Sequence, residues 1–346
     1  MLDVGIIGVD QEWERYRPAL SKLRRPLRVQ AVYDPVRARA ERAAERLQAH
    51  VVTGLQALAK RSDVQAILLF NADWMSHELL QLLLAQNKPV FVNPWFFATP
   101  ETYRALYDQA AETGLPVMPT MWRRFAPATM RLRELIATEL GPPQSIRCDT
   151  TWNESRSACT ECEELVGWLD YCRMLFRVYP TSLTQQSENN ETLRIVTSFG
   201  TGNDTRQAIL TIRLPRDVAV AEATSTDGPT SRIARVSNQI RNWSLNETNP
   251  HIISTPNDLA EIHIACENGS ATVLSRTKLA WQSGTNVESP NESSSDVHTE
   301  SLTSERPEHE VMLDLFCRRV VGGLIPVADF NDIYQASRLL QNAFEV

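Results

Sequence analysis

The first third of the chain alternates short apolar runs with longer amphipathic stretches. Strands are predicted at residues 4–9, 27–33, 50–53, 64–70, 89–92 and 116–119, and helices at 14–23, 36–47, 55–61, 77–86 and 100–113. Continuous apolar strands linked by helices are typical of a parallel sheet that is buried on both faces. We therefore predict an α/β domain over residues 1–120, with a Rossmann-type, doubly wound sheet.

The pattern changes after about residue 145, where segments rich in β-branched residues replace the continuous apolar runs. Strands are predicted at 145–152, 191–199, 206–214, 218–223, 260–267 and 270–279, and helices at 129–140, 164–177, 310–320 and 329–344. Few helices separate these strands, so we predict an α+β domain over residues 121–346 with a large, mostly antiparallel sheet. Residues at about 283–309 are rich in Ser, Thr, Asn and Glu, and a solvated polar loop is expected there.

Charge and composition argue against several classes of protein. The chain has 35 basic and 42 acidic residues, a formal charge of −7, which favours binding neither to nucleic acid nor to an anionic membrane. No apolar run approaches the roughly 20 residues of a membrane span, and no targeting segment precedes the first predicted strand. A cytoplasmic location is the expectation, and the six cysteines are expected to be reduced thiols.

The turn after the first predicted strand stands where a dinucleotide-binding loop reads Gly-x-Gly-x-x-Gly. Gly8 is present, but Asp10 and Trp13 replace the second and third glycines. A carboxylate about 5 Å from a phosphate costs about 3 kcal/mol at an effective dielectric near 20, which is about a hundredfold in affinity. Asp34 ends the second predicted strand, where an acidic residue binds the ribose hydroxyls or caps the next helix.

Several segments, taken in order and with their spacing, resemble the Gfo/Idh/MocA oxidoreductases, the group of glucose–fructose oxidoreductase and inositol dehydrogenase. These segments are residues 4–8, 31–40, 62–67, 77–79, 87–92, 124–127 and 133–136. The resemblance implies NAD or NADP as the cofactor, a small-molecule ligand in the cleft between two domains, and a homo-oligomer formed through the C-terminal sheet. The predicted cofactor-binding residues are Gly8, Asp10, Asp34, Arg39, His77 and Asn93.

Members of that family carry two catalytic motifs that this chain lacks. One is Glu-Lys-Pro after the fifth strand, and the other is His-x-x-Asp on the first helix of the second domain. The matching residues, 93–95 and 167–170, read Asn-Pro-Trp and Gly-Trp-Leu-Asp, so the lysine and the histidine are missing. Because loss of a general acid or base typically costs about 10²–10⁴-fold in rate, we predict a catalytically degenerate relative that binds a ligand or acts as a scaffold.

Two other functions stay open. One is an active NAD(P)-dependent sugar or polyol oxidoreductase with a divergent site, in which Asp170 or Tyr171 carries the proton. The other is a protein-interaction module that retains only the fold.

Further side chains have both a functional and a structural interpretation. Cys159 and Cys162 form a C-x-x-C that could bind zinc with Cys148 and Cys172, although a coincidental pair in a loop is favoured. His77 either contributes to catalysis or forms a local hydrogen bond at a helix start. The aromatic residues either pack in the core or line a ligand cleft; they are Trp74, Trp95, Phe96, Phe97, Trp122 and Trp152. Arg123 and Arg124 could bind a carboxylate or phosphate or form a structural ion pair.

Overall fold

The computed structural model describes residues 1–23, 27–70, 77–93, 99–151, 158–189, 192–213, 261–284, 297–303 and 306–344. The chain divides into two compact units, which are described separately. Unit 1 comprises Met1–Phe125 and Glu305–Tyr334, and unit 2 comprises Ala126–Ser304 and Gln335–Val346. The chain therefore contributes to unit 1 twice, before and after the strands of unit 2.

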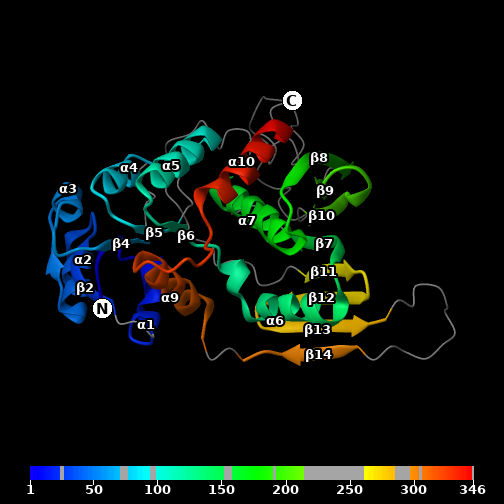
Figure 1. Ribbon diagram of the computed structural model, residues 1–346, viewed down its shortest axis with the longest axis horizontal. Helices are drawn as coiled ribbons and strands as arrows, with labels where there is room; N and C mark the ends of the chain where they lie inside the picture. The colour runs from blue at the N-terminus through cyan, green and yellow to red at the C-terminus, as the bar shows by residue number, and fades with distance from the viewer. Residues whose placement is uncertain are drawn as a thin grey trace, which may run out of the picture. The chain divides into compact units, whose positions relative to one another are not determined.

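Unit 1 contains a six-stranded parallel sheet in the order β3-β2-β1-β4-β5-β6. Strands β2, β4, β5 and β6 of this sheet are labelled in Figure 1. The strands are β1 (Leu2–Ile7), β2 (Leu27–Tyr33), β3 (His50–Val51), β4 (Ala66–Leu69), β5 (Val90–Val92) and β6 (Val117–Pro119). The helices are α1 (Gln11–Leu20), α2 (Arg37–Leu47), α3 (Leu55–Ala59), α4 (Glu78–Ala85), α5 (Pro100–Thr113), the 3₁₀ helix η1 (Trp122–Phe125) and α9 (Glu308–Val320). The predicted doubly wound parallel sheet is confirmed.

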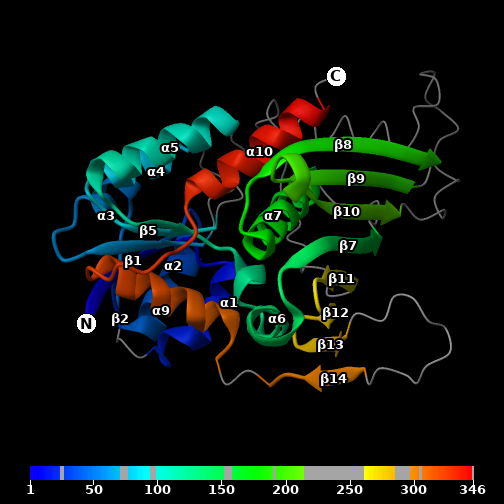
Figure 2. The ribbon, with the colours of Figure 1, turned by 45° about the vertical axis from the view of Figure 1, so that its right-hand side comes forward.

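Helices cover both faces of this sheet, which explains why its strands read as continuous apolar runs. Helices α4 and α5 lie on one side, and α1 and α9 lie on the other (Figure 2). At Gly5 in β1 a Cβ atom would lie only 2.9 Å from Cδ1 of Ile67 and 3.1 Å from Cδ1 of Leu58. A larger residue would require the ends of these two side chains to shift, so Gly5 favours the close packing of α3 on β1.

A cluster of aromatic rings fills the space between α1, the sheet and α9. Trp13 and Tyr16 of α1 are almost fully buried, and their ring centroids lie 5.6 and 4.9 Å from that of Phe70. Phe91 of β5 extends the cluster to Phe316 of α9, at 5.6 Å. Burial raises the pKa of the Tyr16 phenol well above its usual value, so this ring stays uncharged.

Unit 2 contains an eight-stranded sheet in the order β14-β13-β12-β11-β7-β10-β9-β8. The strands are β7 (Pro143–Thr151), β8 (Pro180–Asn189), β9 (Thr192–Phe199), β10 (Arg206–Arg213), β11 (Glu261–Cys266), β12 (Gly269–Ser275), β13 (Lys278–Ser283) and β14 (His298–Ser301). Among the strands that the structure describes in this sheet, β7 and β10 pair in parallel and the other pairs are antiparallel, so the predicted mostly antiparallel sheet is confirmed.

One face of this sheet is packed and the other is partly exposed. Along β9, Leu193, Ile195, Thr197 and Phe199 are buried, while the residues that alternate with them are half-buried, as expected for a sheet with one solvated face. Helix α6 (Pro127–Leu135), continued by a π-helical turn at Ile136–Leu140, packs on β12 and β13. Helix α7 (Ala158–Phe176) packs on β7. The final helix is α10 (Phe330–Phe344), and none of the described helices is long and apolar enough to cross a membrane.

Three sequence predictions in unit 2 were wrong. The strand expected at 270–279 is two strands, β12 and β13, that reverse at residues 276–277. Strand β8 was missed because its sequence is largely polar, which a strand at the end of a sheet tolerates. The polar loop expected at about 283–309 contains strand β14 and the first turn of α9. The strand predicted at 218–223 lies outside the described residues.

Glu300 fixes β14 at the end of the sheet. Its two carboxylate oxygens accept hydrogen bonds from Nε and a terminal nitrogen of Arg131 in α6, at 2.9 and 3.1 Å. Nε1 of Trp281 in β13 donates to the same carboxylate at 2.9 Å. The hydrogen bonds from Arg131, and then that from Trp281, lower the pKa of Glu300.

Replacing Glu300→Gln should therefore change how the stability of unit 2 depends on pH. Because the pKa of Glu300 is lower in the folded chain, its carboxylate stabilises unit 2 above the ordinary glutamate pKa of about 4.3, and this contribution is lost as the pH falls through the folded pKa. Thermal melts should show the variant to be less stable than wild type at pH 7, with a gap that narrows toward pH 3. Glu139→Gln, at an exposed glutamate of the same unit, should leave the profile unchanged. A gap that is constant with pH would contradict this role.

Candidate functional site

The carboxyl ends of the parallel strands meet at one edge of the unit 1 sheet, where doubly wound proteins bind ligands. Gly8 follows β1, Asp34 follows β2, and Asn93 follows β5, as the sequence predicts. The backbone N–H of Asn93 donates to the carbonyl of Leu69 at 3.1 Å, which aligns the ends of β4 and β5. This edge is the candidate dinucleotide site.

Gly8 turns the chain sharply away from β1. Its φ of +79° lies in the left-handed region, and its N–H donates to the carbonyl of Tyr33 at 3.0 Å. A residue with a Cβ would be strained in this conformation, so the first glycine of the motif retains its conformational role.

Asp34 links the first two turns of unit 1 through backbone amides. One carboxylate oxygen accepts from the N–H of Val9 at 2.8 Å, and the other accepts from the N–H of Val36 at 2.8 Å. Helix α2 begins at Arg37 with Val36 as its N-cap, so the expectation that Asp34 caps the helix was wrong. Asp34 forms an Asx turn instead. Each oxygen retains a lone pair for a hydroxyl donor, although the residue is only 7% exposed.

Asp10 is the N-cap of α1. Its carboxylate accepts a hydrogen bond from the backbone N–H of Glu12 at 3.0 Å. Glu12 and Glu14 add two further carboxylates in the first turn of the helix. The helix N-terminus that holds the pyrophosphate in dinucleotide-binding proteins therefore has negative side chains of its own.

Trp13 occupies the position of the third glycine and is 2% exposed. Its indole packs against Phe70, so an aromatic contact replaces the close approach of helix and strand that a glycine permits.

The remaining predicted cofactor residues lie on separate elements. Arg39 is exposed on α2. His77 is half-buried at the start of α4. Its side chain makes no hydrogen bond that caps the helix, so the prediction of a local side-chain hydrogen bond at the helix start was wrong for a capping bond. The backbone carbonyl of His77 accepts from the N–H of Gln81 at 3.1 Å.

Arg124 of η1 forms a structural ion pair with a residue of α10 in unit 1. It contacts a carboxylate oxygen of Asp332 at 2.6 Å, and both side chains are largely buried. The partner lies 208 positions away, so no local sequence signal identifies it.

Arg123 stacks over the ring of Trp122, with the guanidinium carbon 4.7 Å from the centroid. Trp122 is half-buried, and the other candidate aromatic residues, Trp74, Trp95, Phe96, Phe97 and Trp152, lie outside the described residues.

In unit 2, helix α7 carries the residues suggested as alternative proton carriers. Asp170 is buried and accepts a hydrogen bond from Arg173 at 3.3 Å. Tyr171 is also buried, and its ring stacks with that of Trp168 at 6.5 Å. Gly167, at the start of the Gly-Trp-Leu-Asp stretch, lies in the same helix.

The structure describes the side chains of only some of the cysteines in the C-x-x-C hypothesis. Cys159 and Cys162 lie on α7, so the expectation of a loop was wrong, and their side chains are outside the described part of the structure. Cys148 and Cys172 are buried and are not joined in a disulfide. Burial, and then the neighbouring Cys148, raise the pKa of Cys172 well above its usual value. Where side chains are described, no group of three or more potential ligands could hold a metal ion.

Sequence comparison finds a family model that matches most of the first stretch of unit 1. The family described as "Oxidoreductase family, NAD-binding Rossmann fold", the Gfo/Idh/MocA family, matches residues 2–121. The N-terminal region is therefore similar in sequence to the NAD-binding Rossmann domain of this family. No curated protein sequence matches the chain.

Solved structures extend the shared fold to the whole chain. UDP-N-acetylglucosamine 3-dehydrogenase from Acidithiobacillus ferrooxidans has a TM-score of 0.70 at 15% identity, covering 99% of this chain and 96% of that one. A dehydrogenase from Chromobacterium violaceum has a TM-score of 0.75 at 15% identity, covering 99% and 94%. An NAD-binding oxidoreductase from Klebsiella pneumoniae has a TM-score of 0.70 at 14% identity, covering 99% and 96%. At these identities the similarity shows a common fold.

Removing the Asp34 carboxylate should destabilise unit 1. Asp34→Ala leaves the N–H groups of Val9 and Val36 without their acceptors, and each costs about 1–3 kcal/mol when buried. We expect denaturant unfolding to show a total loss of about 2–4 kcal/mol. The control is Asp63→Ala, which breaks an exposed pair with Arg61 and should cost less than about 1 kcal/mol. Equal losses in the two variants would contradict the linking role of Asp34.

Proposed function

We propose that this chain is a catalytically degenerate relative of the Gfo/Idh/MocA oxidoreductases that acts as a ligand-binding or scaffolding protein. The observation that carries the proposal is the hydrogen bond from the Glu12 N–H to the Asp10 carboxylate. In a working dinucleotide site this helix end would receive the pyrophosphate.

The first turn of α1 does not fit a pyrophosphate. A bound phosphate would have to displace the Asp10 carboxylate from its amide donor or lie beside it. At about 5 Å and an effective dielectric near 20, that repulsion is about 3 kcal/mol. Glu12 is paired with Arg15 at 2.9 Å, but Asp10 adds a charge that the glycine of the family motif does not have.

The catalytic positions support the same proposal. The sequence has Pro94 where the family has lysine, and proline has no side-chain proton to donate. Gly167 stands at the position of the family's histidine. Asp170, the alternative proton carrier, is buried and paired with Arg173. Hydride transfer at a carbon bearing a hydroxyl needs a base for the hydroxyl proton, and these positions supply none.

A divergent NAD(P)-dependent sugar or polyol oxidoreductase is the second candidate. The family match over residues 2–121 favours it, as does Asp34 at the end of β2, where an acidic residue would bind the ribose hydroxyls.

For the quaternary structure we propose a homo-oligomer that forms through the sheet of unit 2. Val196 and Ile209 are paired across β9 and β10 on its partly exposed face. These apolar side chains support burial of that face in an assembly.

Titration calorimetry with NADH and NADPH tests the proposal, and Asp10→Gly is the informative variant. Wild type should show no saturable binding up to about 1 mM, and the variant should bind at least tenfold more tightly because about 3 kcal/mol of repulsion is removed. The cost to the helix should be only a few tenths of a kcal/mol, since glycine is a tolerated N-cap. The control is Glu14→Gln, which removes one exposed charge from the same turn and should change affinity less than threefold.

Two results would overturn the proposal. Micromolar binding of either dinucleotide to wild type would mean that the Asp10 carboxylate is accommodated. Reduction of NAD⁺ or NADP⁺ by a sugar or polyol would establish the oxidoreductase instead.

A further inference from the structure

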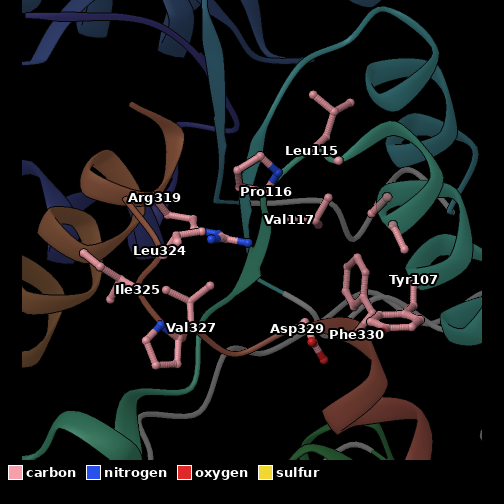
Figure 3. A pocket seen from close by; sticks show the side chains of 14 residues that line it. Tyr107, Leu115, Pro116, Val117, Arg319, Leu324, Ile325, Val327, Asp329 and Phe330 are labelled. Carbon is pink, nitrogen blue, oxygen red and sulfur yellow. The ribbon is translucent and has the colours of Figure 1, made fainter. Parts of the chain in front are cut away.

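Unit 1 contains a pocket of about 650 Å³ that is separate from the candidate dinucleotide edge (Figure 3). The pocket is lined by the end of α5, the residues leading into β6, Arg319 of α9, and residues 324–327 and 329–330. Its volume lies within the roughly 300–1,000 Å³ of pockets that bind small molecules.

The position of this pocket in the sheet distinguishes it from a cofactor site. Leu115 and Pro116 precede β6, and Val117 is its first residue, so the pocket lies at the amino end of that strand. Dinucleotides bind doubly wound sheets at the opposite, carboxyl edge. Strand β6 is also the last strand of the sheet order, so the pocket lies at the rim of unit 1.

The walls of the pocket are mostly apolar. Leu115, Pro116 and Val117 line one side, and Ile325 and Val327 come from the segment before α10. Tyr107 and Phe330 lie together at another part of the wall (Figure 3). Such a lining suits an aliphatic or aromatic body.

Arg319 is the cation of the pocket. It extends from α9 toward Pro116 and Val117 (Figure 3), and one terminal nitrogen donates to the carbonyl of Gly323 at 3.2 Å. No carboxylate among the described residues pairs with it. A guanidinium has five N–H donors in a planar fork, so donors remain for a ligand carboxylate.

Asp329 also lines the pocket, but its carboxylate accepts hydrogen bonds from backbone N–H groups at the start of α10. Its carboxylate accepts from the N–H groups of Asn331 and Asp332 at 3.0 and 3.2 Å, at the start of α10. It lies beside Phe330, and Arg319 approaches from the α9 side (Figure 3). The guanidinium of Arg319 and the carboxylate of Asp329 therefore lie at different parts of the pocket wall.

We propose that this pocket binds a small amphipathic carboxylate. The carboxylate accepts hydrogen bonds from the guanidinium of Arg319, and the apolar body packs against Val117, Ile325 and the Tyr107–Phe330 wall. This proposal goes beyond the proposed function and does not depend on it, because the pocket and the candidate dinucleotide site lie at opposite edges of the unit 1 sheet. The dinucleotide titration tests only the carboxyl edge, so the two proposals can fail separately.

Calorimetry and ligand-observed NMR with 4-phenylbutyrate test the site, and the neutral probe 4-phenylbutyramide is the matched comparison. We expect 4-phenylbutyrate to bind with a Kd of about 1 mM or tighter, which is the range for a ligand of about twelve non-hydrogen atoms. The neutral amide should bind at least tenfold more weakly. Arg319→Gln should weaken carboxylate binding about tenfold or more, since a charge-assisted hydrogen bond is lost. Arg318→Gln, at the exposed neighbouring arginine, should leave it unchanged.

A second pair of variants separates binding from the contact that Arg319 makes with Gly323. Ala111→Leu adds bulk to the pocket wall without altering Arg319, whereas Ala105→Leu adds the same bulk to an exposed position of α5 outside the pocket. Binding that is reduced at least fivefold in Ala111→Leu and retained in Ala105→Leu supports the site. Equal affinity for the acid and the amide, unchanged binding in both Arg319→Gln and Ala111→Leu, or no binding of the acid at 10 mM would overturn it.

Discussion

One carboxylate positions the candidate dinucleotide edge of unit 1. Asp34 accepts hydrogen bonds from the N–H groups of Val9 and Val36, so the turn after β1 and the turn after β2 are held together by the same side chain. Gly8 can then leave β1 with a positive φ and donate to Tyr33. This arrangement places Asp10 at the N-terminus of α1, where it caps the helix. The turn after β1 therefore combines a left-handed glycine with a negative charge at the N-terminus of α1.

The packing of α1 explains how the fold accommodates the loss of the motif glycines. A glycine at position 13 would let the helix approach the sheet, but Trp13 instead joins the aromatic cluster that contains Phe70 and Tyr16. Phe316 of α9 extends this core, so segments far apart in sequence share it. Burial of these rings stabilises unit 1. A Rossmann sheet can therefore persist when the chemistry of its loop changes, because fold and activity depend on different residues.

The sequence predicts unit 1 better than unit 2. Continuous apolar runs such as residues 64–70 identify buried parallel strands, and the predicted elements agree with those found. Strand β8 escaped prediction because polar residues dominate it, and β14 because Glu300 is fixed by the distant Arg131 and Trp281. In the candidate site, spacing located Gly8, Asp10 and Asp34, but it could not show that Asp34 bonds to Val9 rather than capping α2. Such contacts depend on how close the turns lie in space.

The backbone amide of Glu12 gives the most direct test of this account, since the account requires the Asp10 carboxylate to occupy it. Its ¹⁵N–¹H resonance can be followed in isotope-labelled protein while NADH or NADPH is added. The account predicts that this resonance stays unchanged up to about 1 mM of either dinucleotide, where an ordinary cofactor site would be saturated. A saturable shift of the Glu12 amide at micromolar dinucleotide would contradict it, because a phosphate would then have replaced the carboxylate at the start of α1.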